Sequence, residues 1–427
     1  MKTSLLRMTA VIAAAGISLL SCAVRAAAEG PAPGKIVGGY FEEWSIYGAN
    51  YNIANLQQNG VAARLTDLMY AFANVTTDPA PACAYADTWA DYQTPYLPSV
   101  NGTPYAGPLY GNFAAIQQLK QLHPKLKVLM SIGGASATNT AAFSAAASTA
   151  AGRKALASSC ISLFVEGNIA PGITAPGLFD GFNIDWEFPT ATDTANFTAL
   201  LAEFRQQLNA LSRKTGKTYV MSFDGPAGAQ NYVNIDLKRA AAQVDFITVD
   251  GYNYAGSWDT QTNHASPLFD DRQDPLFGQG LDIDATVDAY LKAGVPPRKY
   301  TMGLPLYGAG WTGVPNVNHG LYQESTGPAP SPAGDTLATA GVATYATLAA
   351  ATGYTPTYDW RRIAVTLYSP ATETFWTYDD PLTTVLKMIY INSKVPGGLG
   401  GAYVWAVKDD DANGTMTKTM ARFLDEH

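Results

Sequence analysis

The stretch FDGFNIDWE, residues Phe179–Glu187, decides how the rest of the sequence is interpreted. Its apolar residues predict a β-strand over Phe179–Trp186. Because successive side chains of a strand point to opposite faces, Asn183, Asp185 and Glu187 lie on one face. Carboxylates on the inner face of a buried strand cost free energy unless they have partners, and no cationic residue lies nearby in the sequence. A functional site is therefore favoured over the alternative, a structural network of ion pairs.

Seven further short apolar runs predict strands of the same kind, because near-continuous apolar segments are typical of parallel strands buried on both faces. These strands are Lys35–Phe41, Asp67–Val75, Leu126–Gly133, Thr218–Phe223, Val244–Asp250, Tyr300–Leu306 and Gly400–Val407. The clearest helices between them are Asn112–His123, Ala141–Val165, Thr194–Ser212 and Thr383–Asn392. This alternation predicts an α/β fold, a (β/α)8 TIM barrel, whose active site lies at the C-terminal ends of the strands, where Glu187 stands.

The seventh and eighth strands are too far apart in the sequence to be joined by one helix. Residues 313–380 lie between them and include a segment with a helical sequence pattern at Thr344–Ala351. Two strand-like segments, Arg361–Leu367 and Thr374–Tyr378, flank Ser369-Pro370-Ala371 and predict a hairpin. We therefore expect a small α+β insertion over residues 313–380, with the barrel built from 29–312 and 381–427.

The first 28 residues have the pattern of a secretory signal peptide. Two basic residues precede the apolar run Met8–Leu20, and an A-x-A pattern ends at Ala28, where cleavage is expected. A membrane anchor is the weaker interpretation, because the run is shorter than the ~20 residues that a spanning helix needs. Lipid attachment at Cys22 is a minor alternative. We expect an extracellular protein.

Charge and composition narrow the class of partner. The chain has 427 residues, of which 15% are charged, and its net charge is −8. Loss of residues 1–28 removes three basic residues and no acids, which makes the mature charge −11. No cluster of five or more Lys and Arg occurs, so a nucleic-acid partner is not expected. No later run of 18 apolar residues follows, so we expect no membrane contact of the mature form. We also expect a monomer.

Cysteine and histidine usage indicates neither a metal nor another cofactor. Two cysteines, Cys83 and Cys160, remain after the signal peptide, and an oxidising compartment permits one disulfide between them. Two unpaired thiols are equally compatible with the sequence. Neither cysteine belongs to a CxxC motif, and the four histidines show no i, i+4 pairing, which disfavours a zinc site.

The stretch around Glu187 resembles the D-G-x-D-x-D-x-E signature of the family 18 glycoside hydrolases, the chitinase family. Asp180, Gly181, Asp185 and Glu187 match the signature. The resemblance extends over almost the whole mature chain, and the insertion is similar to that of the larger subfamily. The other segments that resemble the family are Lys35–Gly48, Ser131–Gly134, Val244–Trp258, Gly303–Trp311 and Gly398–Trp405.

The resemblance implies hydrolysis of chitin or N-acetylglucosamine oligosaccharides without a cofactor. Glu187 is then the general acid, and burial together with the Asp185 carboxylate is expected to raise its pKa. The family uses the substrate's own 2-acetamido carbonyl as nucleophile, with retention of configuration, an exception to the two-carboxylate scheme. Asp185 would orient the acetamido N–H, Tyr252 would donate a hydrogen bond to its carbonyl, and Trp405 would form the floor under the sugar.

Further candidates for the site come from neighbouring strands and loops. Tyr40 and Ser131 are expected to form hydrogen bonds with Asn183, although both fit the description of plain core polar residues equally well. Asn253 is a candidate for substrate binding. Three loop tryptophans offer flat surfaces on which sugars can stack, and ordinary loop packing is as compatible with their positions. These tryptophans are Trp44, Trp258 and Trp311.

Three positions depart from the family pattern. Asn183 stands where the family usually has Asp, Asn253 follows Tyr252 where Asp is usual, and Ala309 replaces a common Arg. We expect Asn183 to donate an amide hydrogen to an ionised Asp185. Because Glu187, Asp185 and Tyr252 are intact, these changes bear on pH dependence and rate more than on the reaction class.

Two other functions fit the same sequence. A non-catalytic chitin-binding lectin is disfavoured because such proteins usually lack the acid that Glu187 supplies. An endo-β-N-acetylglucosaminidase acting on N-glycans is the other alternative. The insertion, which deepens the binding site along a linear polymer, favours chitin.

Overall fold

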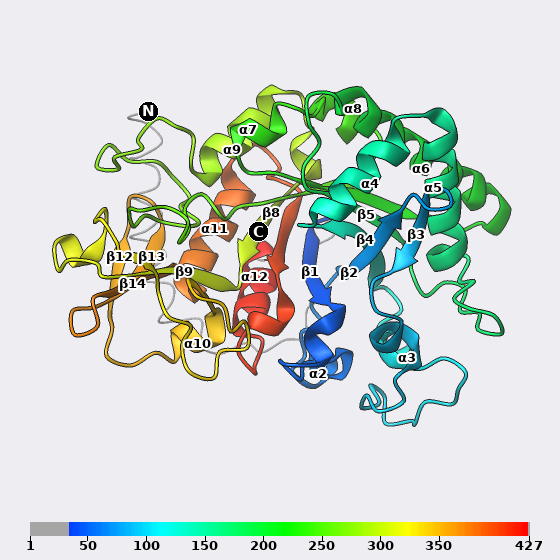
Figure 1. Cartoon of the computed structure of the whole chain (residues 1–427), viewed down its shortest axis with the longest axis horizontal. Helices are drawn as coiled ribbons and strands as arrows, with labels where there is room; N and C mark the ends of the chain where they lie inside the picture. Colours follow the sequence, from blue (N-terminus) through cyan, green and yellow to red (C-terminus); the bar gives the residue numbers. More distant parts are fainter. Residues whose placement is uncertain (1–33, 426–427) are drawn as a thin grey trace. The chain divides into compact units, whose positions relative to one another are not determined.

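The computed structural model describes residues 34–425, and a closed barrel of eight parallel strands forms its centre there. The strands are β1 (Ile36–Glu42), β2 (Asp67–Thr76), β4 (Lys127–Gly134), β5 (Gly181–Trp186), β6 (Val220–Gly225), β7 (Phe246–Val249), β8 (Tyr300–Pro305) and β15 (Gly401–Trp405). They follow the order β1-β15-β8-β7-β6-β5-β4-β2, and pairing of β1 with β2 closes the ring (Figure 1). The predicted barrel is confirmed, whereas the predicted signal peptide, residues 1–28, and Cys22 lie outside the described residues.

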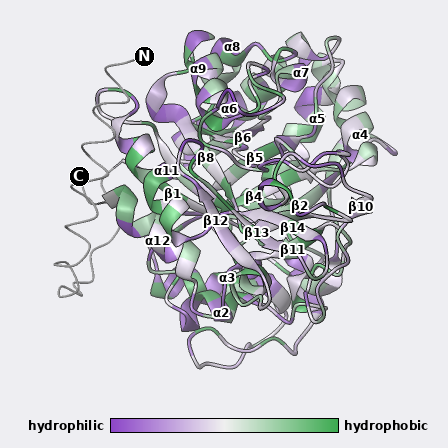
Figure 2. Cartoon of the chain, turned by 90° about the vertical axis from the view of Figure 1, so that its left-hand side faces the viewer, coloured by the Kyte–Doolittle hydropathy of each residue, from purple (hydrophilic) through white to green (hydrophobic). Residues whose placement is uncertain are grey.

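Helices that bury one face against the strands surround the barrel. In the long helix α6 (Thr194–Thr215), Phe197, Leu201, Phe204 and Leu208 are buried at a spacing of three or four residues. Figure 2 shows hydrophilic and hydrophobic residues mixed on the helices around the barrel, as this one-sided burial requires. The other helices around the barrel are α2 (Ile53–Gln58), α3 (Gly111–Leu122), α4 (Ala137–Ala147), α5 (Ala150–Cys160), α7 (Ala229–Tyr232), α8 (Leu237–Ala241), α9 (Ile283–Lys292), α11 (Pro381–Ser393) and α12 (Thr415–Asp425). Among them the short α7 is the exception to this burial, because none of its residues is buried.

The prediction of one helix over Ala141–Val165 is wrong. The segment contains α4 and α5, and a π-helical turn over Ile161–Val165 follows them. Thr149 causes the break, because its extended backbone ends the first helix and its hydroxyl accepts a hydrogen bond from the N–H of Gly152. Such a cap starts a new helix. The alanine-rich segments on both sides of Thr149 continue the helix-like pattern across it, so the pattern alone does not reveal the break.

A second, six-stranded sheet forms the insertion; it lies beside the barrel in Figure 1 and in front of it in Figure 2. The expected hairpin is present as antiparallel β13 (Ala364–Ser369) and β14 (Thr374–Tyr378). The prediction began the insertion at residue 313, but the sheet already contains β9, from Tyr307. Gly310 explains this, because a Cβ there would lie 2.4 Å from the Trp376 ring, so only glycine lets β9 pack against β14. The elements of the insertion are β9 (Tyr307–Thr312), β10 (Gly327–Pro328), β11 (Val342–Thr344), α10 (Tyr345–Ala349), β12 (Thr355–Asp359), β13 (Ala364–Ser369) and β14 (Thr374–Tyr378).

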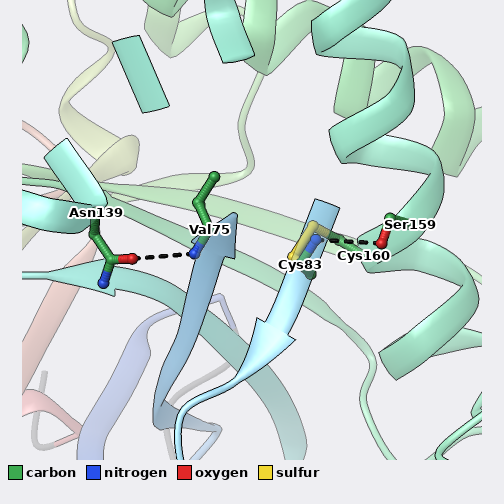
Figure 3. Close-up of a disulfide and its surroundings, with 5 residues drawn as sticks. All are labelled: Val75, Cys83, Asn139, Ser159 and Cys160. Carbon is green, nitrogen blue, oxygen red and sulfur yellow. Dashed lines mark hydrogen bonds between the residues drawn. A yellow bond between two sulfur atoms is a disulfide. The ribbon is translucent and has the colours of Figure 1, made fainter. Parts of the chain in front are cut away.

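A disulfide between Cys83 and Cys160 resolves the alternative that the sequence left open. Cys83 belongs to β3 (Ala82–Tyr85), an antiparallel edge strand on β2, and Cys160 ends α5 (Figure 3). The N–H of Cys83 also donates to the hydroxyl of Ser159, at 3.2 Å. The disulfide therefore attaches β3, which follows β2 in the chain, to α5 in the helix layer.

Removal of this disulfide should destabilise the protein without changing its fold. A Cys83→Ala, Cys160→Ala double variant is expected to lose about 2–4 kcal/mol of unfolding free energy, because the unfolded chain regains the freedom of a 77-residue loop. Urea unfolding followed by circular dichroism measures the loss. Reductant should lower the wild-type midpoint to that of the variant and leave the variant unchanged, and equal midpoints for the two oxidised proteins would contradict the expectation.

Candidate active site

Strand β5 carries the central residues of the site into the barrel. Asn183 is 0% exposed and Asp185 4% exposed, whereas Glu187, just beyond the C-terminal end of the strand, is partly exposed. Gly181 allows this placement, because its φ is +154° and a Cβ there would lie 1.7 Å from the carbonyl oxygen of Val220. The glycine of the motif thus serves close contact between β5 and β6.

Asp180 lies at the other end of β5 and has a structural role. It forms an ion pair with Lys120 of α3 at 2.7 Å, and its carboxylate accepts the N–H of Val128 at 2.9 Å. Sequence analysis had no means of detecting this cation, since Lys120 is distant along the chain. The contact anchors the N-terminal end of the strand that carries Glu187.

The Asn183 side chain has hydroxyl partners on four other strands of the barrel, β1, β4, β6 and β7. Its Oδ1 accepts hydrogen bonds from Tyr40 at 3.0 Å and Ser131 at 2.8 Å, as predicted. Its Nδ2 donates to Ser222 at 2.9 Å and to Thr248 at 3.3 Å. An amide group offers two donors and two acceptor positions, and all are used.

These contacts correct one expectation. Both amide hydrogens of Asn183 are donated to hydroxyl groups, so the predicted donation to Asp185 is wrong. The physical reason is the direction of the side chain, which points across the barrel to β6 and β7 instead of along its own strand. Asn183 therefore supports the site as a neutral, fully hydrogen-bonded core residue.

Asp185 and Glu187 form a carboxyl pair whose environment favours the protonated forms. Burial raises the pKa of Glu187 to about 7, and the negative charge of Asp250 contributes to the rise. The expectation that Asp185 raises this pKa is wrong, because Asp185 holds its own proton and its hydrogen bond lowers the pKa of Glu187. Burial also raises the pKa of Asp185 well above its usual range, followed by the effects of Glu187 and Asp250. Glu187 can thus hold a transferable proton near neutral pH, which is what a general acid requires.

Two carboxyl groups that sequence analysis did not select complete the cluster. Asp224, on β6, is 7% exposed and accepts a hydrogen bond from Thr248 at 3.2 Å. Asp250 directly follows β7 and accepts a hydrogen bond from Tyr403 at 2.9 Å. Burial raises the pKa of both side chains. A strand-by-strand search for acids at the C-terminal ends would have found them.

The loop after β7 brings Tyr252 into the same cluster. Tyr252 is 8% exposed, and its hydroxyl lies 3.4 Å from that of Tyr403. Asn253, in contrast, is exposed, and its Oδ1 accepts a hydrogen bond from Tyr307 at 2.8 Å. The structure therefore places Tyr252 beside the carboxyl groups and Asn253 at the outer edge of the site.

A buried lysine holds this loop in place. Lys387 of α11 is 0% exposed and donates to Asp379 at 2.6 Å and to the Ser266 hydroxyl at 2.7 Å. The same hydroxyl donates to the carbonyl oxygen of Gly251 at 2.5 Å. Asp250 and Tyr252 flank Gly251, so the chain on either side of the insertion fixes their backbone.

Aromatic rings continue from the barrel interior toward the surface. Trp405 contacts Tyr40, with ring centroids 5.1 Å apart, and stacks on Phe72 at 5.7 Å. Phe72 in turn contacts Trp44, at 6.0 Å, and Trp44 is 39% exposed. Sequence analysis did not select Phe72, because the apolar residues around it have the pattern of any buried core strand. Trp405 and Trp44 thus lie where the predicted stacking roles require, and those roles remain predictions.

The other two tryptophans differ sharply in exposure. Trp258 is 67% exposed, so its ring is accessible to a ligand. Trp311 is 0% exposed, and its ring N–H donates to the carbonyl oxygen of Asp259 at 3.0 Å. The prediction that Trp311 binds substrate is wrong, because the ring, on β9, is buried between its own sheet and the loop after β7, in contact with Phe375 and Ala265, and leaves no face for a sugar.

Comparison with known proteins agrees with this geometry. Residues 36–410 match the family model described as glycosyl hydrolases family 18. The chain belongs to this family. It is 31% identical to Chitinase A1 of Niallia circulans over 91% of this chain and 58% of that protein, and 30% identical to Endochitinase 1 of Metarhizium robertsii over 95% and 90%. The catalytic domain of the psychrophilic chitinase B from Arthrobacter TAD20 superposes with a TM-score of 0.84 and 33% identity, over 92% of this chain and 96% of that one.

The part of the chain that the structure describes contains neither a metal cluster nor a membrane-spanning helix. Between residues 34 and 425, no group of three or more His, Cys, Asp or Glu side chains could hold a metal ion. Within the same residues, no helix has the length and apolar character needed to cross a membrane.

Proposed function

We propose that this family 18 chain is a chitinase that hydrolyses β-1,4-linkages between N-acetylglucosamine residues with retention of configuration. One observation carries the proposal: a partly exposed Glu187, whose pKa is raised to about 7, stands beside the buried Asp185 at the C-terminal end of β5. The relatives and the solved structure named above are all called chitinases, which supports the same substrate class. The Niallia protein is longer, and this chain spans 58% of it.

In the proposed first step, Glu187 gives its proton to the glycosidic oxygen as the bond from the anomeric carbon to that oxygen breaks. The carbonyl oxygen of the substrate's 2-acetamido group attacks the anomeric carbon, and an oxazolinium ion forms. The Asp185 carboxyl oxygen accepts a hydrogen bond from the acetamido N–H and so directs the acetamido carbonyl toward the anomeric carbon. The hydroxyl of Tyr252 stabilises the same group by donating a hydrogen bond.

In the second step, water attacks the anomeric carbon and the bond to the acetamido oxygen breaks. The Glu187 carboxylate takes the proton of the attacking water, which restores the acid and releases the β-anomer. The substrate supplies the nucleophile in this scheme because the remaining carboxyl groups are engaged elsewhere. Asp224 is buried beside Thr248, and the carboxylate of Asp250 is hydrogen-bonded by Tyr403.

Glu187→Gln tests the enzyme against a chitin-binding lectin. Gln keeps the shape of the side chain but has no transferable proton, so kcat/KM on soluble N-acetylglucosamine oligomers should fall by about 10²–10⁴-fold or more. Chitin binding, measured by calorimetry, should persist. A wild-type protein that binds these oligomers without cleaving any of them would support the lectin, and cleavage of N-glycans alone would support the endo-β-N-acetylglucosaminidase.

Substrate assistance makes a separate prediction about the sugar. Fully deacetylated oligomers should resist cleavage, because they lack the carbonyl oxygen that attacks the anomeric carbon. Proton NMR of the acetylated oligomers should show the β-anomer first, with the α-anomer appearing only by mutarotation. Initial release of the α-anomer would contradict the mechanism.

We also propose that the protein is exported. The signal-like pattern of residues 1–28 supports export, and the Cys83–Cys160 disulfide is typical of an oxidising compartment. Terminal sequencing of the protein from its natural producer should find Glu29 at or close to the first position. A cytoplasmic product that retains Met1 would refute export, and an acylated Cys22 would establish the lipoprotein alternative.

A further inference from the structure

We propose that Asp250 is a positioning residue of this site: its carboxylate is the anion that keeps the proton on Glu187. This inference rests on the proposed function, since it concerns the general acid of that reaction. It assigns a role to a residue outside the signature around Glu187.

The geometry holds the Asp250 carboxylate in a defined place. Its backbone N–H donates to the carbonyl oxygen of Gly225 at 3.0 Å, and its Oδ1 accepts the hydroxyl of Tyr403 at 2.9 Å. A Cβ at Gly303 would lie 2.6 Å from that hydroxyl and 2.9 Å from the ring of Tyr252, so glycine at this position on β8 admits both tyrosines. Asp250 is therefore fixed by hydrogen bonds from β15 and to β6, and the glycine of β8 leaves room for the tyrosine that binds it.

The hydroxyl partners distinguish Asp250 from the other carboxyl groups. Burial raises the pKa of Asp250 to about 6, and in the substrate-free protein hydrogen bonds from Tyr252 and Tyr403 restrain the rise. In the proposed reaction the Tyr252 hydroxyl turns to the substrate, and Tyr403 remains the donor to Asp250. Asp250 in turn raises the pKa of Glu187, which is about 7. Between these two values Asp250 is ionised while Glu187 still holds its proton. Negative charge enters the cluster first at the residue that has phenolic donors.

Other groups around Asp250 remain neutral over this range. The carboxyls of Asp185 and Asp224 have pKa values raised well above their usual range, by burial and by Asp250 itself. Asn183 is an amide and contributes no charge. The remaining titratable groups that sense Asp250 are tyrosines with raised pKa values, which stay protonated: Tyr40, Tyr252, Tyr254, Tyr290, Tyr300, Tyr307 and Tyr403.

The sign of the effect follows directly. A negative charge near Glu187 disfavours a second negative charge, so it raises the pH at which the acid loses its proton. The rate falls as Glu187 deprotonates, which produces the basic limb of the pH profile. Removal of the Asp250 charge should therefore move that limb to lower pH.

The test compares Asp250→Asn with Asp224→Asn and the wild-type protein. kcat/KM is measured against pH on one soluble N-acetylglucosamine oligomer at fixed ionic strength. Asp250→Asn should lower the midpoint of the basic limb by about one pH unit, equivalent to a loss of about tenfold on the alkaline side. Asp224→Asn is the matched control: the residue is buried in the same cluster and uncharged in this range, so its replacement should move the limb much less.

Tyr403→Phe gives a second test that survives misfolding of the first variant. Loss of the phenolic donor makes Asp250 ionise at higher pH, so the basic limb should again move downward, by a smaller amount. Thermal unfolding checks that each variant is folded. If the wild type is active and the basic limb of folded Asp250→Asn stays in place or moves upward, the role of Asp250 is overturned. If Asp250→Asn does not fold, the same result in Tyr403→Phe overturns it. An inactive wild type would instead refute the proposed function.

Discussion

The cost of burying carboxyl groups inside a closed barrel governs this site. Four of them meet at the C-terminal ends of three adjacent strands, where water cannot stabilise all their charges at once: Asp185, Glu187, Asp224 and Asp250. The protein resolves the conflict with protons and hydroxyl donors. Phenolic hydroxyls stabilise the charge of Asp250, while burial, together with that charge, keeps a proton on Glu187. The same penalty that threatens stability thus produces the acid that the reaction needs.

Much of the scaffold exists to hold these groups in position. The ion pair of Asp180 with Lys120 anchors one end of β5, and glycine at 181 lets the neighbouring strand approach. At the other side, Lys387 and Ser266 fix the backbone of Gly251. These contacts involve no reacting atom, and they tie the barrel to the segment that returns from the insertion. The geometry of the site therefore depends on the segment that follows the insertion as well as on the barrel strands.

The sequence predicted those features that depend on local pattern. All eight barrel strands could be found because buried parallel strands are continuous apolar runs, and Asp185 and Glu187 because alternation places them on one face. Features set by distances across the barrel could not be found this way. Asp224 and Asp250 stand at strand ends that a search of the sequence can mark, but their membership of one cluster follows only from closure of the barrel. Asn183 turns toward hydroxyls on other strands, and Trp311 is buried by packing between β9 and its neighbours, which no local pattern specifies. The break at Thr149 was missed because alanine-rich text surrounds a single capping residue.

Closure of the ring by its first and last strands has a consequence for how the protein is made. Ile36 pairs with Gly401, so nearly the whole described chain separates two residues that are neighbours in one sheet. Contacts of such long sequence separation form late, because a large loop must first be ordered. During synthesis the ring stays open, with β1 and β8 as bare edges, until the final strand emerges. A polypeptide that ends before Gly401 would keep those edges exposed to other chains, which makes the last strand decisive for solubility as well as for the fold.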